Sequence, residues 1–397
     1  MSRLFLNELG IVTPLGTGCA EVSENLMAGS QAGIRLKAGY LPDQDVHVGV
    51  VDADLPELGP EWAPDDSRNN ALFLRALQQI EPAILQAKEQ YGADRIAVIV
   101  GTSTSGLSDS EPAIRQKMTG DEFPPDFDYA RQDPGSISTF VARYYGLTGL
   151  NIAVSTACTS SVKALATARR LIRAGICDAA IVGGADTLCR FTLNGFHSLD
   201  SVSSNICNPF SRNRDGITIG EGAAAFLVTP EPGPVEVLGI GESSDAHHIS
   251  APDPEAAGAI AAMQGAIDDA GIAPGQVGYV NLHGTATPLN DAMEALAVTT
   301  VFGDQTCCSS TKGMTGHMLG AAGGCELGFL WLMLHPDFAD GALPPHIWDG
   351  ELDRDIPGLK LVTQGQKLPD KAPLALSNSF AFGGNNVSVL VGRAGQA

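Results

Sequence analysis

The sequence predicts an α/β fold in which helices pack against both faces of a sheet. Short runs rich in β-branched residues alternate along the chain with longer, alanine-rich stretches of helical periodicity. Several of these runs, such as residues 97–100 and 180–182, are apolar throughout, which is typical of strands covered on both faces. Residues 229–234 contain three prolines and one glycine, so we place a boundary there and expect two units, residues 1–232 and 233–397.

The predicted elements follow one another in a regular order. Strands are expected at residues 95–100, 150–154, 179–182, 224–228, 277–281, 374–377 and 387–391. Helices are expected at residues 66–90, 160–174, 255–270, 291–301 and 317–334. Residues 108–134 are polar and interrupted by proline, and we interpret them as a cap inserted into the first unit.

Composition and charge narrow the classes of function. The chain has 397 residues, of which 44% are hydrophobic and 17% charged, so it can bury a large core. Its 24 Lys and Arg residues against 45 Asp and Glu residues give a net charge of −21. Such a charge argues against binding of nucleic acid or of an anionic membrane surface. An acidic partner could bind only at a locally basic surface, for which Arg68 and Arg131 are candidates.

The cysteines and the apolar segments indicate a cellular compartment. Eight cysteines are spread along the chain without a C-x-x-C pair, which argues against a disulfide scaffold and against a zinc site. The longest apolar stretch, residues 327–334, is far shorter than a membrane-spanning helix, and the first residues contain no apolar stretch of secretory length. We therefore expect a cytoplasmic protein.

The densest chemical signal is the segment Val-Ser-Thr-Ala-Cys-Thr-Ser-Ser at residues 154–161, between a predicted strand and a predicted helix. Cys158 should therefore lie at a helix start, where free N–H groups and the helix dipole lower the pKa of a thiol. The same N–H groups could bind a developing oxyanion. From the residues alone, a nucleophile and a buried structural cysteine both remain open for Cys158, whereas the other seven cysteines lack this context.

Two histidines lie in Gly- and Thr-rich loops that follow apolar runs. His283 stands in Val-Asn-Leu-His-Gly-Thr-Ala-Thr at residues 280–287. His317 stands in Thr-Gly-His, with Lys312 five residues before it and Glu326 nine residues after it. Loop histidines of this kind are better placed for chemistry than for packing. The other six histidines have no comparable frame, and we expect them on the surface or in the core.

The third element is the loop Asn-Ser-Phe-Ala-Phe-Gly-Gly-Asn-Asn at residues 378–386. Its glycines permit positive φ and a close approach of backbone N–H groups to a ligand. The same residues also predict a turn between the last two strands.

In this order, the motifs are similar to those of the β-ketoacyl-[acyl carrier protein] synthases, and residues 10–16 and 214–222 extend the resemblance over nearly the whole chain. The resemblance implies a thiolase-like fold of two similar halves in five α-β-α-β-α layers. It implies that Cys158 accepts the acyl group and that His283 and His317 act on the malonyl group. The further residues that it implicates are Lys312 and Glu326 as a charged pair, Thr285 and Thr287 at the pantetheine, Thr104 near the depth of the acyl channel, and the backbone N–H groups of Cys158 and Phe382 as the oxyanion hole.

The implied reaction is a decarboxylative condensation in fatty-acid or polyketide elongation that requires no metal or other cofactor. Its partners would be an acyl carrier protein in acyl and malonyl forms, with homodimerisation expected and a heterodimer with a ketosynthase-like subunit possible. The chain departs from the family pattern at Ala381, where Gly is usual, and at Asn385, where Thr is usual. The Ala at this position predicts a restricted loop.

Four other classes of protein share parts of these motifs. A degradative thiolase needs a second cysteine in the last loop, and residues 379–386 contain none. A chain-initiating condensing enzyme pairs Cys with His and Asn, which His317 opposes. A non-catalytic, chain-length-determining subunit usually lacks the nucleophile. A cysteine hydrolase would cleave a thioester without forming a carbon–carbon bond.

Overall fold

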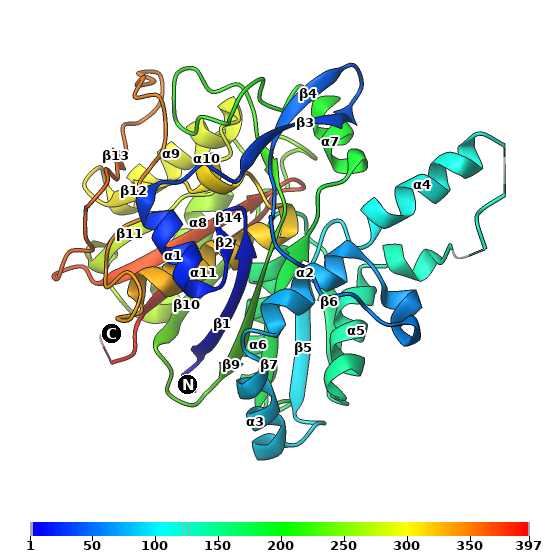
Figure 1. Cartoon of the computed structure of the whole chain (residues 1–397). Helices are drawn as coiled ribbons and strands as arrows, with labels where there is room; N and C mark the ends of the chain where they lie inside the picture. The colour runs from blue at the N-terminus through cyan, green and yellow to red at the C-terminus, as the bar shows by residue number, and fades with distance from the viewer. Residues whose placement is uncertain (1–2, 121, 126, 396–397) are drawn as a thin grey trace.

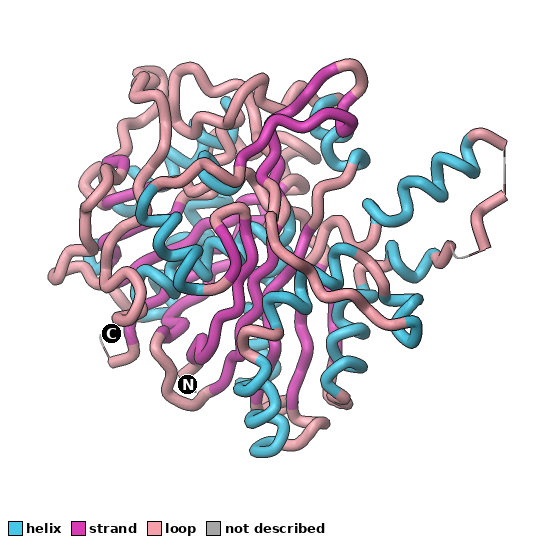
Figure 2. The backbone as a smooth tube through the Cα atoms, in the orientation of Figure 1, coloured by secondary structure: helices cyan, strands magenta, loops and turns pink. Residues whose placement is uncertain are grey.

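The computed structural model describes residues 3–120, 122–125 and 127–395 of the chain, and its largest element is one mixed sheet (Figures 1 and 2). The strands are β1 Phe5–Thr13, β2 Gly16–Thr17, β3 Ile34–Leu41, β4 Gln44–Gly49, β5 Ile96–Gly101, β6 Asn151–Val154, β7 Ala179–Asp186, β8 Ile219–Gly220, β9 Gly222–Thr229, β10 Val235–Ser244, β11 Val277–Asn281, β12 Cys307–Ser309, β13 Lys360–Leu361, β14 Leu374–Ala381 and β15 Asn385–Arg393. The large sheet has the order β13-β12-β11-β14-β15-β10-β1-β9-β7-β5-β6, and β2 pairs with β1.

The large sheet consists of two halves with the same topology. When the five main strands of each half are numbered in chain order, both β6-β5-β7-β9-β1 and β12-β11-β14-β15-β10 read 3-2-4-5-1. In both halves the first three strands of this spatial order are parallel and the last two pairings are antiparallel. The halves join where β1 meets β10, through the pairs Phe5↔Glu236 and Leu6↔Val235.

Helices cover both half-sheets and fill the space between them. They are α1 Cys19–Ala28, α2 Arg68–Leu77, α3 Glu81–Tyr91, α4 Leu107–Met118, α5 Gly135–Tyr145, α6 Ser160–Arg173, α7 Arg190–His197, α8 Ala257–Ala270, α9 Pro288–Phe302, α10 Lys312–Thr315 and α11 Ala322–Leu334, with short 3₁₀ turns η1 Pro60–Asp65, η2 Tyr129–Gln132, η3 Pro274–Gln276 and η4 Leu319–Ala321. Helices α6 and α11 contact each other and strands of both half-sheets, so they form a middle layer. Helices α2, α3 and α5 cover the outer face of the first half, and α8 with α9 covers that of the second. The result is five layers, which confirms the predicted fold class.

The middle layer explains the composition of its helices. Every residue of α11 is buried, which matches a segment that is apolar except for Glu326. In each half the chain leaves the third strand, β6 or β12, and then enters a helix of this layer, α6 or α11. Both junctions therefore lie at the centre of the molecule.

Residues 107–118 form the helix α4, which extends away from the body of the molecule (Figures 1 and 2). Only Ser110 and Ala113 of this helix are buried, and Met118 at its end is 82% exposed. Helix α4 is therefore a projecting arm, and the interpretation of residues 108–134 as a cap inserted into the first unit stays a prediction.

Two predicted helices have different bounds in the structure. The single helix expected at residues 66–90 is two helices, because Pro82, in the first turn of α3, has no backbone N–H that could continue the hydrogen bonds of α2. The helix expected from His317 begins only at Ala322, since His317 pairs with Ile219 in a β-bridge and Leu319 has a φ of +49°. The expected strands lie at β5, β6, β7, β9, β11, β14 and β15.

No helix in the described ranges is long and apolar enough to cross a membrane.

Candidate active site

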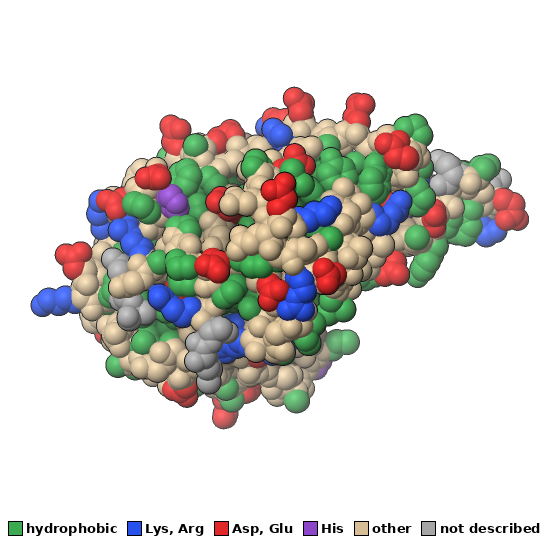
Figure 3. Space-filling view, turned by 90° about the horizontal axis from the view of Figure 1, so that it is seen from below, with side chains coloured by type: hydrophobic (Ala, Val, Ile, Leu, Met, Phe, Trp, Pro, Cys, Tyr) green, Lys and Arg blue, Asp and Glu red, His purple; other side chains and the backbone are tan. Residues whose placement is uncertain are grey.

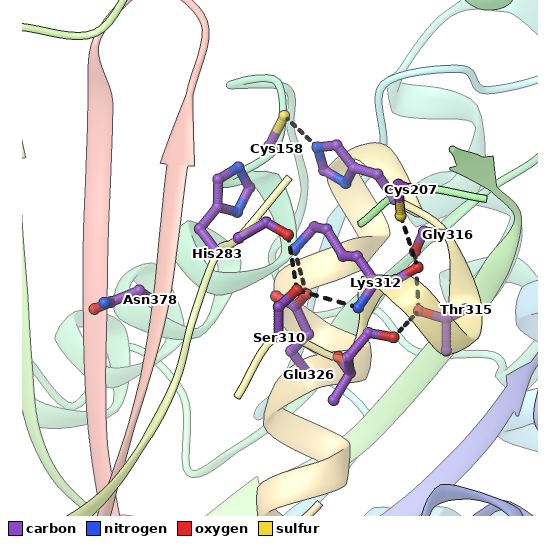
Figure 4. A network of polar contacts seen from close by, with 12 residues as sticks. Cys158, Cys207, His283, Ser310, Lys312, Thr315, Gly316, Glu326 and Asn378 are labelled. Carbon is purple, nitrogen blue, oxygen red and sulfur yellow. Dashed lines mark hydrogen bonds and ion pairs between the residues drawn. The ribbon is translucent and has the colours of Figure 1, made fainter. Parts of the chain in front are cut away.

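The structure brings Cys158, His283 and His317 together at the centre of the molecule (Figure 4). The thiol sulfur and one ring nitrogen of each histidine all lie within 4.8 Å of one another. Cys158 follows β6 of the first half, whereas His283 follows β11 and His317 follows β12 of the second half. The three side chains are buried, so a reaction among them would be shielded from bulk water.

A tight turn presents Cys158 to the two histidines. The hydroxyl of Ser160 accepts a hydrogen bond from the backbone N–H of Thr156 at 2.9 Å and donates one to the carbonyl of Ala157 at 2.6 Å. Ala157 has a φ of +54°, a conformation that costs energy for a residue with a Cβ. Helix α6 then begins at Ser160, so the structure places Cys158 directly before a helix start, as the sequence predicts.

The ionisation state of Cys158 differs from the sequence expectation. Burial raises the pKa of this thiol to about 12, and the nearby charge of Lys312 opposes that shift without cancelling it. The expectation of a lowered pKa is therefore wrong, because desolvation in the middle layer outweighs the favourable helix start. The thiol holds its proton at neutral pH.

His317 is the group that faces this proton. Its Nε2 atom lies 3.0 Å from the Sγ atom of Cys158. Burial and the charge of Lys312 hold the pKa of His317 well below its usual value, and the same two causes together with His317 lower that of His283. Both imidazoles are therefore neutral near pH 7, and each can accept or donate one hydrogen bond. Their ring centroids are 5.2 Å apart at an interplanar angle of 86°.

The charge that acts on both histidines belongs to a buried ion pair. Lys312 Nζ donates to Glu326 Oε1 at 2.5 Å, and each side chain is 1% exposed. Burial raises the pKa of Glu326, whereas the Lys312 ammonium opposes this shift. The sequence spacing of the two residues about His317 therefore corresponds to a real contact beside the site.

Glu294, which sequence reasoning missed, holds the loop of His283. Its carboxylate accepts hydrogen bonds from the backbone N–H groups of His283 at 2.8 Å and Gly284 at 2.7 Å, and from the amide of Asn378 at 3.1 Å. Burial raises the pKa of Glu294 to about 7. The available signal was an acidic residue one turn after Asp291 on the mostly apolar stretch that forms α9.

Asp186 is a second missed residue, at the end of β7. Its Oδ1 atom accepts from the hydroxyl of Thr102 at 2.9 Å, and from the N–H and hydroxyl of Thr104, each at 2.7 Å. Its Oδ2 atom accepts from the N–H of Ala321, just beyond His317. Thr104 is thus fully buried against Asp186 and is not among the residues that line the cavity beside Cys158. Its expected contact with an acyl chain stays a prediction.

A cavity of about 250 Å³ opens beside Cys158 and both histidines. Thr285 and Thr287 line it, and their hydroxyl oxygens lie 3.0 Å apart. Phe382 also lines the cavity, is 36% exposed, and packs against Phe196 at a centroid distance of 5.4 Å. The structure therefore brings all these predicted binding residues to one cavity.

The two basic residues considered for an acidic partner lie on the first half. Arg68 forms an ion pair with the buried Glu221, with Nη2 at 2.6 Å from Oε1, so its charge is already compensated. Arg131 is half-buried and donates to the carbonyl of Ala63. On the face shown in Figure 3, acidic and basic side chains are interspersed.

Two family patterns match this chain. The pattern described as "Beta-ketoacyl synthase, N-terminal domain" matches residues 9–232, and "Beta-ketoacyl synthase, C-terminal domain" matches residues 235–347. Curated proteins named "3-oxoacyl-[acyl-carrier-protein] synthase 2" are similar over their full length. The protein of Coxiella burnetii is 32% identical over 98% of both chains, and that of Staphylococcus aureus strain COL is 31% identical over 98% of this chain and 97% of its own.

Solved structures share the fold over nearly the whole chain. "Ketosynthase (ApeO) in Complex with its Chain Length Factor (ApeC) from Xenorhabdus doucetiae" has a TM-score of 0.94 and 44% identity, covering 99% of this chain and 98% of that one. "The ishigamide ketosynthase/chain length factor" has a TM-score of 0.87 and 27% identity, covering 99% and 100%.

Proposed function

This chain belongs to the β-ketoacyl synthase family, and on that premise we propose that it condenses an acyl group held on Cys158 with a malonyl group on an acyl carrier protein. One observation carries the residue assignment: a protonated thiol and two neutral imidazoles lie within 4.8 Å of one another beside one cavity. A thiol can accept an acyl group, and two imidazoles can stabilise an enolate oxygen.

In the first half-reaction, the sulfur of Cys158 attacks the thioester carbonyl of an acyl carrier protein, while its proton passes to Nε2 of His317. The C–S bond to the carrier breaks, and the carrier thiolate takes the proton back from His317. The backbone N–H groups of Cys158 and Phe382 are the proposed donors to the carbonyl oxygen, which becomes negative in the tetrahedral intermediate.

In the second half-reaction, malonyl on a carrier protein enters the same cavity. The bond to its carboxylate breaks, CO₂ leaves, and the electron pair forms an enolate whose oxygen accepts hydrogen bonds from N–H groups of His283 and His317. For this step the neutral ring of His317 carries its proton on Nε2, because the acylated sulfur of Cys158 no longer has a proton to donate to that atom. The α-carbon then attacks the carbonyl of acyl-Cys158. A carbon–carbon bond forms, the C–S bond breaks, and the released thiolate of Cys158 takes up one proton from solvent.

The remaining predicted residues support these steps. The Lys312–Glu326 pair keeps both histidines neutral, because its ammonium disfavours a second positive charge nearby. Thr285 and Thr287 offer hydroxyls along the cavity, where a pantetheine arm needs hydrogen-bond partners.

The proposed partners are acyl carrier proteins and a second ketosynthase-like subunit. Two structural neighbours are described as a ketosynthase with its chain length factor, which supports a heterodimer as well as a homodimer. Cys158 and both histidines are present, which favours the catalytic subunit over the non-catalytic one. The pathway is fatty-acid or polyketide elongation. All eight cysteines are free thiols, which fits the cytoplasmic location that we propose.

The test is intact-mass analysis after exposure to acyl carrier proteins that bear different chains. One acyl group per chain is expected, and peptide mapping should place it on Cys158. The Cys158→Ala variant should take up no label and make no β-ketoacyl product, whereas Cys177→Ala should behave as the native protein. A label on Cys307 or Cys308 would contradict the assignment.

A further inference from the structure

His346 is a buried histidine that joins two segments next to the candidate site. It is 6% exposed and is not among the residues that line the cavity. Its Nδ1 atom accepts a hydrogen bond from the backbone N–H of Ser310 at 3.1 Å, and its Nε2 atom lies 3.0 Å from the carbonyl oxygen of Pro209. Both ring nitrogens are therefore used.

These two contacts fix the protonation of the ring. Burial lowers the pKa of His346 to about 4, so the imidazole is neutral at physiological pH. A carbonyl oxygen can only accept, so Nε2 carries the proton and donates to Pro209, and Nδ1 is left as the acceptor for Ser310.

Ser310 in turn contacts both loops that carry the histidines of the site. Its hydroxyl donates to the carbonyl of Gly284 at 2.7 Å, directly after His283. The same oxygen accepts from the N–H of Lys312 at 3.3 Å, at the start of the segment that leads to His317. Figure 4 shows Ser310 between His283 and Lys312.

Gly284 lies between Ser310 and Phe210, and His346 connects the two segments that carry these residues. A Cβ at this position would lie 2.6 Å from the Cβ of Ser310 and 2.9 Å from the ring of Phe210, and the residue has a φ of +37°. Phe210 directly follows Pro209, and its ring centroid is 6.1 Å from that of His346. The gap that receives the His283 loop therefore depends on how far apart Ser310 and Phe210 lie.

We propose that His346 is a positioning residue for the condensation: by holding Ser310 and Pro209 at a fixed separation, it sets the place of His283 relative to Cys158 and His317. The inference rests on the proposed function, since it acts through the enolate-binding role of His283. Acyl transfer uses Cys158 and His317, so a displaced His283 should impair decarboxylation much more than acyl loading.

Two amide variants separate the contacts of the ring. His346→Asn places an amide oxygen near the position of Nδ1 and keeps the acceptor for Ser310, whereas His346→Gln places an amide nitrogen near Nε2 and keeps the donor for Pro209. Two reactions are measured on the full-length protein: acyl loading of Cys158 by mass, and CO₂ release from malonyl-acyl carrier protein. His346→Gln should slow CO₂ release by about tenfold or more, since small displacements of a catalytic group cost rate steeply, while acyl loading changes by less than about threefold. His346→Asn loses the donor for Pro209 and should show the same split, because the proposed separation needs both contacts.

Ser310→Ala keeps the backbone N–H that His346 accepts and removes the hydroxyl contacts with Gly284 and Lys312, so it should show the same split and tests the second step of the path from His346 to His283. His335→Gln is the matched control. His335 lies at the end of α11, and its Nδ1 accepts a hydrogen bond from the backbone N–H of Asp337, so it has the same kind of contact away from the site. CO₂ release at the native rate in His346→Gln would overturn the inference, and so would an equal fall of both reactions in all three variants. Native protein that loads acyl groups but releases no CO₂ would contradict the proposed function, and the inference with it.

Discussion

Nε2 of His317 lies 3.0 Å from Sγ of Cys158, and burial shifts the pKa values of the two groups in opposite directions. The thiol keeps its proton because its pKa is raised to about 12, and the imidazole stays unprotonated because its pKa is lowered. A neutral acid therefore faces a neutral base. In the proposed reaction, the thiolate forms as the thiol reacts, with His317 as the acceptor of its proton.

His317→Ala should make the alkylation of Cys158 steeply dependent on pH. Without the imidazole, only free thiolate reacts, and its fraction rises about tenfold per pH unit below the thiol pKa. In the native protein the transfer from thiol to imidazole releases no proton to solvent, so the rate should be nearly flat over the neutral range. The measurement is the rate of iodoacetamide labelling at Cys158, followed by peptide mapping. His283→Ala is the matched control and should keep the native profile. Equal slopes in native protein and His317→Ala would show that His317 does not take the proton.

Glu294→Gln should reduce condensation mainly through kcat. The carboxylate accepts the N–H groups of both His283 and Gly284, and an amide can accept only one of them well, so the His283 loop should shift. The measurement is kcat and KM for malonyl-acyl carrier protein, with KM expected to stay within about threefold because the cavity lining is unchanged. A variant with native kcat would show that the loop does not need this carboxylate.

The same variant should change how stability depends on pH. The folded-state pKa of Glu294 is raised to about 7 from the ordinary value of 4.5, so the unfolded chain loses this proton first as pH rises. Ionisation therefore destabilises the native protein progressively between these values, by up to about 3 kcal/mol. Thermal unfolding should show Glu294→Gln gaining stability relative to the native protein from pH 5 to about pH 7, with no further gain above. A constant difference in Tm would contradict the raised pKa.

Lys312→Met should destabilise the protein more than the double change Lys312→Met with Glu326→Leu. Each side chain is 1% exposed, so removal of one partner leaves a buried group without its counter-charge, which costs about 3–5 kcal/mol. Replacement of both by apolar side chains removes that penalty, although condensation should not return. Chemical denaturation of the three proteins gives the comparison. A double variant no more stable than the single one would show that the pair is not coupled.

Ala381→Gly should speed the acyl loading of Cys158. Ala381 is the last residue of β14 and has no positive φ, whereas Gly383 and Gly384 have φ values of +82° and +77°. A glycine at 381 would let the backbone before Phe382 reach conformations that Ala disfavours by about 1 kcal/mol or more. Rapid-quench loading assays compare the two proteins, with CO₂ release expected to be unchanged. Identical loading rates would show that the residue does not restrict the loop.

Local sequence signals predicted the elements around the site well, whereas the roles of its residues stay predictions. The strand at residues 277–281 has the predicted bounds, and the junction at Cys158 lies where the motif places it. The division into units 1–232 and 233–397 stays a prediction.

The sequence did not predict contacts and pKa shifts that depend on residues far apart in the chain. Glu294 and Asp186 act on the backbones of loops, and no spacing between residues reveals which backbone an acidic side chain will meet. The pKa of Cys158 depends on burial by both halves, and the motif contains only the local helix start. Thr104 was expected near the acyl channel from its position in the family motif alone. In the structure its hydroxyl donates to Asp186, a residue that lies far from it in the sequence.

The repeated topology of the two half-sheets places Cys158 and His317 at equivalent positions, although their side chains differ. Cys158 follows the third strand of one half and His317 follows the third strand of the other, and both segments lead into the middle layer. Two identical chains related by a two-fold axis would place the same side chain at both positions, and a thiol facing a thiol has no proton acceptor. Joining the halves in one polypeptide removes that constraint of symmetry, so a single active site can hold an acid and a base at equivalent positions.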